Sequence, residues 1–170
     1  MMRGNSEPHT VHMFPDYAEI VLWLDGPVGY EHSGLSPELI RGLQEWEQSY
    51  CDSLDSDLEW RSPKAARAFT AVGIDMAGQV ADELGDEFVV EFASYDDDAP
   101  THTVRSLGPG SNKAASAAFA EIVARMEAIE ECVARIVADR GLGAEWAAVA
   151  PLSGDVFTLG DQGGRAEGGD

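Results

Sequence analysis

Two serine–proline pairs, Ser36-Pro37 and Ser62-Pro63, constrain this chain more than any other feature, because each is typical of a helix start. A serine side chain accepts a hydrogen bond from an unpaired amide of the first turn, and proline fits there because its missing N–H is not needed. Each pair is followed by apolar residues at steps of three and four, which predicts two amphipathic helices.

The apolar residues define the face that each helix is expected to bury. In the first helix this face consists of Leu39, Leu43, Trp46, Tyr50 and Leu54. In the second it consists of Phe69, Val72, Met76, Val80 and Leu84, and Gly85 is a natural stop. Gly73 lies beside the second stripe, so we expect another element to approach the helix closely there.

Three short segments are typical of strands. The run IVLWL at 20–24 has apolar residues on both faces, which favours a buried or central strand ending at Gly26-Pro27. The segments around 88–92 and 101–107 alternate and are separated by a DDDAP turn, so they predict an antiparallel hairpin. A further short strand is expected at 156–159.

A third and longer helix is predicted between the GPGSN break and Arg140-Gly141. Its apolar stripe nearly fills three heptads, which raises the hypothesis of a coiled-coil homodimer. The favoured interpretation is that the helix packs across the sheet and the shorter helices, because a coiled coil usually needs more heptads. The candidate self-association residues are Phe119, Ile122, Met126, Ile129, Val133 and Ile136.

Together these patterns predict an α+β fold, with a small, mostly antiparallel sheet covered by three helices, the third of them long. Residues 1–17 are expected to form a flexible N-terminal lead, residues 18–160 a single α+β domain, and residues 161–170 a disordered tail. A chain of this length buries enough surface to fold without a disulfide or metal staple. Cys51 and Cys132 are too few for a disulfide framework.

The charge of the chain is strongly negative, with 31 acidic residues against 11 lysines and arginines and a net charge of −20. Such a surface repels phosphate backbones and anionic lipids, so we expect no direct binding to nucleic acid or membranes. It attracts basic proteins and speeds their association. The sequence shows no secretory leader and no membrane-spanning stretch, which predicts a cytoplasmic protein.

The acidic residues concentrate in two stretches without lysine or arginine, residues 45–60 and 68–104. One interpretation is a solvated surface without a specific role. The other is an electronegative face that binds a partner, with tryptophans as exposed anchors at its edges. The candidate partner-binding residues are Trp46, Glu47, Asp52, Asp55, Asp57, Glu59, Trp60, Asp86, Glu87, Asp96, Asp97 and Asp98.

The sequence predicts no enzyme, no cofactor and no metal site. A calcium loop needs spaced ligands, a central glycine and a closing glutamate, and the acidic runs at 55–59 and 96–98 lack this pattern. His9 and His12 have an HxxH spacing, but their segment has no helical pattern and offers no further ligands. A metal-dependent hydrolase is therefore the least favoured hypothesis.

Three segments also carry a recurrent pattern: LWLDG at 22–26, GLSPELIRGLQEWEQSY at 34–50 and FTAVGIDMAGQVADEL at 69–84. They resemble a class of small acidic bacterial proteins with the motifs LWxxG, GLSxxLxxxLxxWxxxY and FxxxGxxxAxxxxxEL. The resemblance covers about half of the chain and implies an immunity or inhibitor partner of a bacterial toxin, without catalytic residues. The long third helix and the tail depart from this pattern.

The leading hypothesis is a non-enzymatic acidic protein that inhibits one basic partner, such as a toxin or nuclease, in the manner of an immunity protein. One alternative is a DNA mimic that blocks a DNA-binding or defence protein. The other is an assembly or homodimerisation protein that associates through its third helix, with the acidic residues serving only solubility.

Overall fold

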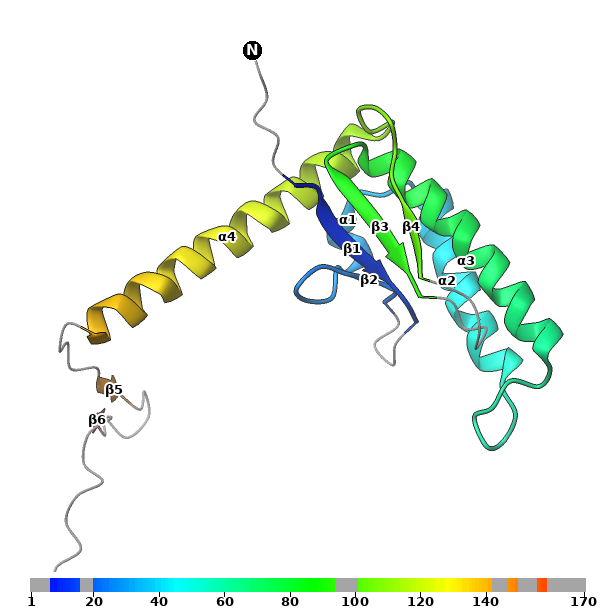
Figure 1. Cartoon of the computed structure of the whole chain (residues 1–170), viewed down its shortest axis with the longest axis horizontal. Coiled ribbons are helices and arrows are strands. Elements are labelled where there is room, and N and C mark those ends of the chain that lie inside the picture. Colours follow the sequence, from blue (N-terminus) through cyan, green and yellow to red (C-terminus); the bar gives the residue numbers. More distant parts are fainter. Residues whose placement is uncertain (1–6, 16–19, 94–100, 142–146, 150–155, 159–170) are drawn as a thin grey trace, which may run out of the picture. The chain divides into compact units, whose positions relative to one another are not determined.

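A computed structural model of the full chain describes residues 7–15, 20–93, 101–141, 147–149 and 156–158. The chain forms two compact units, residues 1–124 and residues 125–170. The first unit holds β1 (His9–Met13), β2 (Leu22–Trp23), α1 (Tyr30–Ser33), α2 (Pro37–Ser53), α3 (Pro63–Leu84), β3 (Phe88–Phe92) and β4 (His102–Val104) (Figure 1). The long helix α4 (Lys113–Gly141) begins in this unit and ends in the second. The predicted α+β class is confirmed.

The sheet of the first unit has the strand order β2-β1-β3-β4. The two outer pairings are antiparallel, whereas β1 and β3 run parallel, with Val11 opposite Val90. The sheet is therefore mixed where a mostly antiparallel one was predicted, because its longest pairing, between β1 and β3, is parallel. The described residues form four helices where three were predicted, because the short α1 precedes α2.

The position of β1 corrects the prediction of a flexible lead over residues 1–17. His9–Met13 lies between β2 and β3, with Val11 and Met13 fully buried and His12 exposed between them. This alternation is typical of a strand with one covered face. The sequence hides it because only two residues of the segment are strongly apolar and the parallel partner lies far along the chain. The predicted tail, 161–170, lies outside the described residues.

The strand predicted at 20–24 is shorter than expected and lies at the edge of the sheet. Only Leu22 and Trp23 pair with β1, opposite Met13 and His12. Val21 and Leu22 are nevertheless fully buried. Both side chains belong to the same core cluster as Val28, and the chain returns beside the strand, where the amide of Val28 donates to the carbonyl of Leu22 at 2.8 Å.

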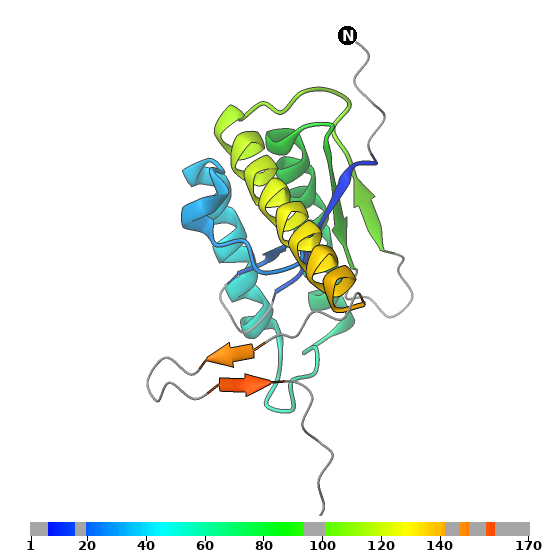
Figure 2. The ribbon, with the colours of Figure 1, turned by 90° about the vertical axis from the view of Figure 1, so that its left-hand side faces the viewer.

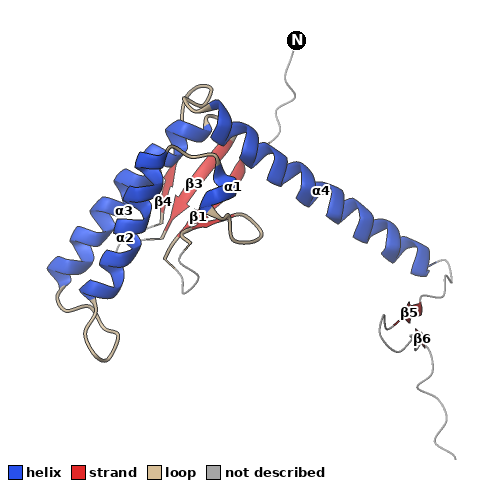
Figure 3. Ribbon diagram, turned by 180° about the vertical axis from the view of Figure 1, so that it is seen from behind, coloured by secondary structure: helices blue, strands red, loops and turns tan. Residues whose placement is uncertain are grey.

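Helices cover one face of the sheet (Figures 1 and 3). Phe88, Val90 and Phe92 point to this covered face and are buried, whereas Val89 and Glu91 are half-buried. α3 packs on β3, and α2 packs on α3. The predicted hairpin of 88–92 with 101–107 is confirmed by the antiparallel β3–β4 pairing.

Both predicted helix starts are confirmed. Ser36 precedes α2 and its Oγ accepts from the Leu39 amide at 3.4 Å, while Ser62 precedes α3 and its Oγ accepts from the Ala65 amide at 3.1 Å. Each cap satisfies one amide that the helix leaves unpaired. Gly85 ends α3 with a φ of 93°, which suits glycine far better than any residue with a side chain.

Gly73 marks the close approach that the sequence predicted. A Cβ added there would lie 2.6 Å from Cζ of Phe92 and 2.8 Å from Cζ2 of Trp46. The buried face of α3 is accordingly richer in small residues than the predicted stripe, and Val72, which was assigned to that stripe, is 45% exposed. The buried residues are Ala66, Phe69, Thr70, Gly73, Ala77, Val80, Ala81 and Leu84.

The second unit holds the end of α4 and a two-stranded sheet. β5 (Ala147–Val149) pairs antiparallel with β6 (Val156–Thr158), with Ala148 opposite Phe157 (Figure 2). The strand predicted at 156–159 therefore corresponds to β6, and β5 was not predicted.

Candidate partner-binding surface

The connection between α2 and α3, residues 54–62, is called the acidic loop below, and the carboxylate of Asp55 holds its turn. Oδ1 of Asp55 accepts hydrogen bonds from the amides of Asp57 at 2.9 Å and Glu59 at 3.1 Å. Leu54 and Trp60 pair as an antiparallel bridge across the base of the turn. Asp55 therefore has a structural part in this loop in addition to its charge, because aspartate side chains mimic a backbone turn.

Leu58 occupies the tip of this turn and was not predicted as a site residue. It is 71% exposed, and among the described residues it is the only non-glycine residue with a positive φ, at 62°. Asp57 and Glu59 flank it and are exposed, as is Asp52 in the last turn of α2. The loop thus presents one leucine among carboxylates. The signal in the sequence was a leucine in an acidic loop that belongs to no helical stripe.

Trp46 is buried, which confirms its place in the apolar stripe of α2 and corrects the hypothesis that it is an exposed anchor of a binding surface. It is only 2% exposed, its ring stacks on Phe69 at a centroid distance of 4.6 Å, and its Nε1 donates to the Phe69 carbonyl at 3.1 Å. The indole turns inward because Gly73 leaves room for it. Trp60 is half-buried and lies edge-on to Tyr50 at 5.6 Å, so it covers the core at the base of the acidic loop.

Glu47 is half-buried on α2, and its charge acts on Tyr30, a half-buried residue whose hydroxyl is buried. Burial of the Tyr30 hydroxyl, followed by the negative charge of Glu47, raises the pKa of Tyr30 well above its ordinary value. Tyr30 therefore stays neutral under physiological conditions. The charge of Glu47 therefore acts on the Tyr30 hydroxyl at the edge of the core and is also part of the acidic surface.

α2 and α3 form a helical pair, and Glu83 lies near the C-terminus of α3, at the end of this pair opposite the acidic loop. Its side chain joins α3 to the N-terminus of α2. Its carboxylate accepts from the amide of Ser36 at 2.9 Å, from the Ser36 hydroxyl, and from Nδ2 of Asn112 at 2.8 Å. The side chain is half-buried, so each donor satisfies part of a charge that has left water. This Ser36–Glu83–Asn112 cluster, called the junction below, resembles a reactive site in composition but holds helix ends together.

Asn112 extends the junction to α4. Its Oδ1 accepts from the amides of Ala114 at 3.0 Å and Ala115 at 3.3 Å, which caps the helix, while its Nδ2 also donates to the carbonyl of Gly34 at 3.0 Å. Three helix ends therefore meet at one carboxylate. Sequence reasoning missed this role of Glu83 because its partners lie far away along the chain.

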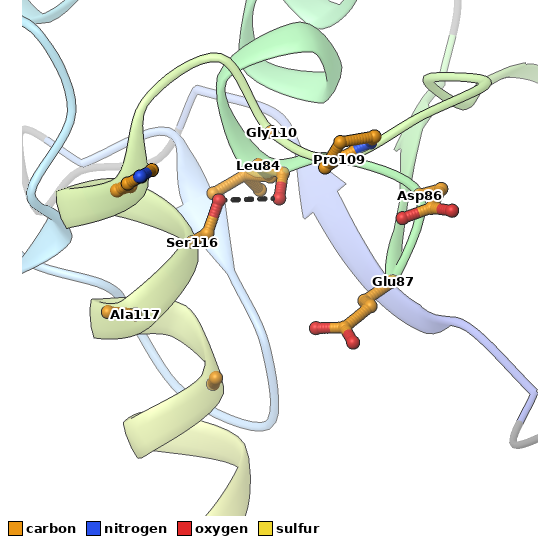
Figure 4. A pocket seen from close by; sticks show the side chains of 9 residues that line it. Leu84, Asp86, Glu87, Pro109, Gly110, Ser116 and Ala117 are labelled. Atoms are coloured by element: carbon orange, nitrogen blue, oxygen red, sulfur yellow. Dashed lines mark hydrogen bonds between the residues drawn. The ribbon is translucent and has the colours of Figure 1, made fainter. Parts of the chain in front are cut away.

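A hollow of about 380 Å³ opens beside the junction (Figure 4). One wall carries Asp86 and Glu87, which directly precede β3, and the facing wall is the first part of α4, where Ser116 and Ala117 lie. Lys113, the first residue of α4, also lines the hollow. Its lining is mainly apolar and consists of Leu84, Asp86, Glu87, Pro109, Gly110, Lys113, Ser116, Ala117 and Ala120. The structure thus brings two of the predicted acidic residues together at one cavity.

The walls of the hollow are fixed by hydrogen bonds. The hydroxyl of Ser116 donates to the carbonyl of Leu84 at 2.9 Å, which ties α4 to the end of α3 (Figure 4). The amide of Asp86 donates to the carbonyl of Gly108 at 2.9 Å, and Arg105 donates to the carbonyl of Asp86 through Nε at 3.0 Å and Nη2 at 2.6 Å. The cavity is therefore formed before any ligand arrives.

Asp96, Asp97 and Asp98 lie outside the described residues. Among the residues that are described, no three histidine, cysteine, aspartate or glutamate side chains come together as metal ligands. His9 and His12 both lie on β1, and Nδ1 of His12 is 3.8 Å from a carboxylate oxygen of Glu91.

The chain matches a known protein family. Residues 9–95 match the family described as Serratia CdiI immunity protein-like, and this match covers just over half of the chain. The chain belongs to the Serratia CdiI immunity protein-like family. A search of curated proteins finds no match.

The part of the chain that matches the CdiI immunity protein-like family runs from β1 to just beyond β3. It includes the acidic loop and both helices of the pair. Glu83 and Ser36 of the junction fall within it, whereas Asn112 and all of α4 follow it. The resemblance to immunity proteins inferred from the three sequence motifs is therefore confirmed at the level of the family.

The candidate self-association residues on α4 divide into two groups. Phe119 is fully buried and lies edge-on to Phe88 at 5.8 Å, so it belongs to the core and is not part of an association surface. Ile122 is half-buried against the same core. Further along, Met126 and Ile136 are half-buried, whereas Ile129 and Val133 are exposed.

Within the described part of the chain, no helix combines the length and the apolar character needed to span a membrane.

Proposed function

We propose that this protein is a non-enzymatic immunity protein of the contact-dependent growth inhibition type, which binds and inhibits a bacterial toxin. The observation that carries the proposal is the family match over residues 9–95, which includes three of the four strands of the sheet, β1, β2 and β3, and both helices that frame the acidic loop. The three motifs shared with small acidic immunity-like proteins support the same function.

The toxin surface that fits this protein is basic. The net charge of −20 favours rapid capture of a cationic partner. The carboxylates of Asp52, Asp57 and Glu59 are exposed, and the turn that carries two of them is held by Asp55. Leu58 supplies an apolar contact inside this charged rim, which is how interfaces concentrate binding energy. We infer that the acidic loop is a principal toxin contact.

The test uses the toxin domain encoded beside the gene for this chain. The two proteins should co-purify and the complex should suppress toxicity when both are expressed in one cell. Isothermal titration at about 50 and 200 mM salt should show clear weakening at the higher concentration, because salt screens charge pairs at an exposed surface. Absence of a complex at both concentrations would refute the proposed function.

Loop variants locate the contact. Leu58→Asp and the double variant Asp57→Asn/Glu59→Gln should weaken the complex at least about tenfold, because they remove the apolar contact or two charges. Glu38→Gln, an exposed carboxylate at the start of α2, is the matched control and should retain affinity within about twofold. Competition by duplex DNA for the same toxin surface would identify the DNA-mimic form of inhibition.

Association through α4 is a second candidate function. Ile129, Val133 and Val137 follow one another at helical spacing and are 52–62% exposed. Exposed apolar side chains at this spacing favour helix-mediated assembly. Light scattering on the full chain tests it: a dimer that becomes a monomer in Ile129→Asp/Val133→Asp supports assembly, and a wild-type monomer at high micromolar concentration rejects it.

A further inference from the structure

We propose that the hollow between the start of β3 and the first turns of α4 receives a lysine or arginine side chain of the toxin. This inference rests on the proposed function and adds a second contact site to the acidic loop. Its basis is a cavity of about 380 Å³ that has an apolar floor and carries Asp86 and Glu87 on one wall (Figure 4).

The shape and lining suit a side chain that projects from a protein surface. Ligand pockets for free metabolites enclose most of their ligand. Here Pro109, Ala117 and Ala120 at the lining are all exposed, so the hollow is open. The apolar lining accommodates the methylene stem that lysine and arginine share, since these side chains bury their stems while the charged head keeps polar partners.

The charges specify a cationic head group. Asp86 is half-buried and Glu87 is exposed; both line the hollow, and Figure 4 shows the Glu87 carboxylate directed toward α4 and the Asp86 carboxylate farther from the helix. A cation seated beside Glu87 gains a charge-assisted hydrogen bond, which is roughly twice as strong as a neutral one, and Asp86 adds a second negative charge nearby. The positive charge of Lys113 on α4 repels a bound cation. Removal of that charge is therefore expected to strengthen cation binding.

Neighbouring features support the hollow as the centre of an interface patch. The hydrogen bonds from Ser116, Asp86 and Arg105 described above fix both walls, so binding costs little ordering. Leu107, two residues before Pro109, is fully exposed and offers an apolar contact close by along the chain. Basic residues that enter pockets beside an apolar contact are typical of strongly binding interface positions.

The first experiment titrates the full chain with Nα-acetyl-arginine amide and follows backbone amide shifts by NMR. Saturable shifts are expected at Glu87, Lys113 and Ala117, and Nα-acetyl-glutamine amide should produce none. Lys113→Gln should tighten binding about threefold because it removes a like charge. Shifts confined to other residues, or equal shifts with the glutamine amide, would overturn the proposal.

The second experiment measures toxin affinity after the hollow is filled. Ala117→Phe should weaken the complex at least tenfold, whereas Ala124→Phe, an exposed alanine of the same helix outside the lining, should leave it unchanged. Equal affinity of the two variants would overturn the proposal while the proposed function stands. If the wild-type chain fails to bind the toxin, the proposed function fails, and the arginine-amide titration alone decides whether the hollow accepts a basic side chain.

Discussion

The two ends of the α2–α3 helical pair use acidic residues in opposite ways. At the junction, Glu83 accepts hydrogen bonds from Ser36 and Asn112 and joins three helix ends. At the loop, Asp57 and Glu59 are exposed and offer their carboxylates to solvent. Within the loop only Asp55 acts as an acceptor that shapes the chain. Acidic residues in one stretch of sequence therefore have different roles. A carboxylate close to unpaired amides stabilises the fold, whereas one without such amides stays available to a partner.

The strongest test of this comparison is Glu83→Ala. We expect the free energy of unfolding to fall by about 3 kcal/mol, because the donors of Ser36 and Asn112 lose a charged acceptor at a half-buried site. Urea denaturation followed by circular dichroism measures the change. Asp52→Ala at the loop end is the control, with an expected change within about 0.5 kcal/mol. Equal effects of the two substitutions would remove the distinction between the ends.

The next test concerns the middle of the helical pair, between its two ends, where Gly73 of α3 packs closely against Trp46 of α2. Gly73→Ala should destabilise the protein by about 2 kcal/mol, because the new methyl group would press on Phe92 and Trp46. Gly78→Ala in the same helix has open space around it and should stabilise by about 0.5–1 kcal/mol through helix propensity. Thermal unfolding of both variants gives the sign of each effect, and a stabilising Gly73→Ala would contradict the close packing.

Within the loop itself the comparison can be sharpened with Asp55 and Asp57. Asp55→Ala should cost about 1 kcal/mol because two amides of the turn lose their acceptor. Asp57→Ala should change the unfolding free energy by less than about 0.5 kcal/mol while weakening toxin binding. Chemical denaturation and titration calorimetry on the same samples separate the two effects. A loss of stability in Asp57→Ala equal to that in Asp55→Ala would show that both carboxylates shape the turn.

The smallest effect is expected at Tyr30, where Glu47 links the acidic surface to the core edge. Because the folded-state pKa of Tyr30 is raised, its contribution to stability is complete below the unfolded pKa of about 10 and is lost as the pH rises above that value. Tyr30→Phe should therefore lose less stability than the wild type between about pH 9.5 and 11. Parallel slopes of unfolding free energy against pH would contradict the raised pKa.

Features set by local chemistry were predictable from the sequence. Ser36 and Ser62 act on amides only three residues away, and the position of Gly73 beside an apolar stripe pointed to close packing. Contacts between distant segments were not predictable. His9–Met13 has few apolar residues and finds its parallel partner only in the folded sheet. The apolar stripe of α2 predicted that Trp46 is buried, but the contacts of its ring with Phe69 and with the space at Gly73 come from another helix and could not be read from the stripe.

The same limit applies to the candidate surface. The acidic loop was predicted from charge alone, but Leu58 at its tip depends on the turn that Asp55 organises. Asp86 and Glu87 were chosen for charge, whereas the cavity beside them exists because α4 crosses the start of β3. Composition therefore identified which residues carry charge, and the fold determines which of them share a surface.

The place of β1 inside the sheet has a consequence for biosynthesis. β1 is synthesised before its parallel partner β3, which ends at Phe92, so the nascent β1 segment must wait for β3 to emerge before the two strands can pair. A start site or protease cut beyond Met13 would leave β2 and β3 with unpaired inner edges exposed to aggregation. A fusion partner placed ahead of His9 therefore needs a long spacer, so that β1 remains able to insert between β2 and β3.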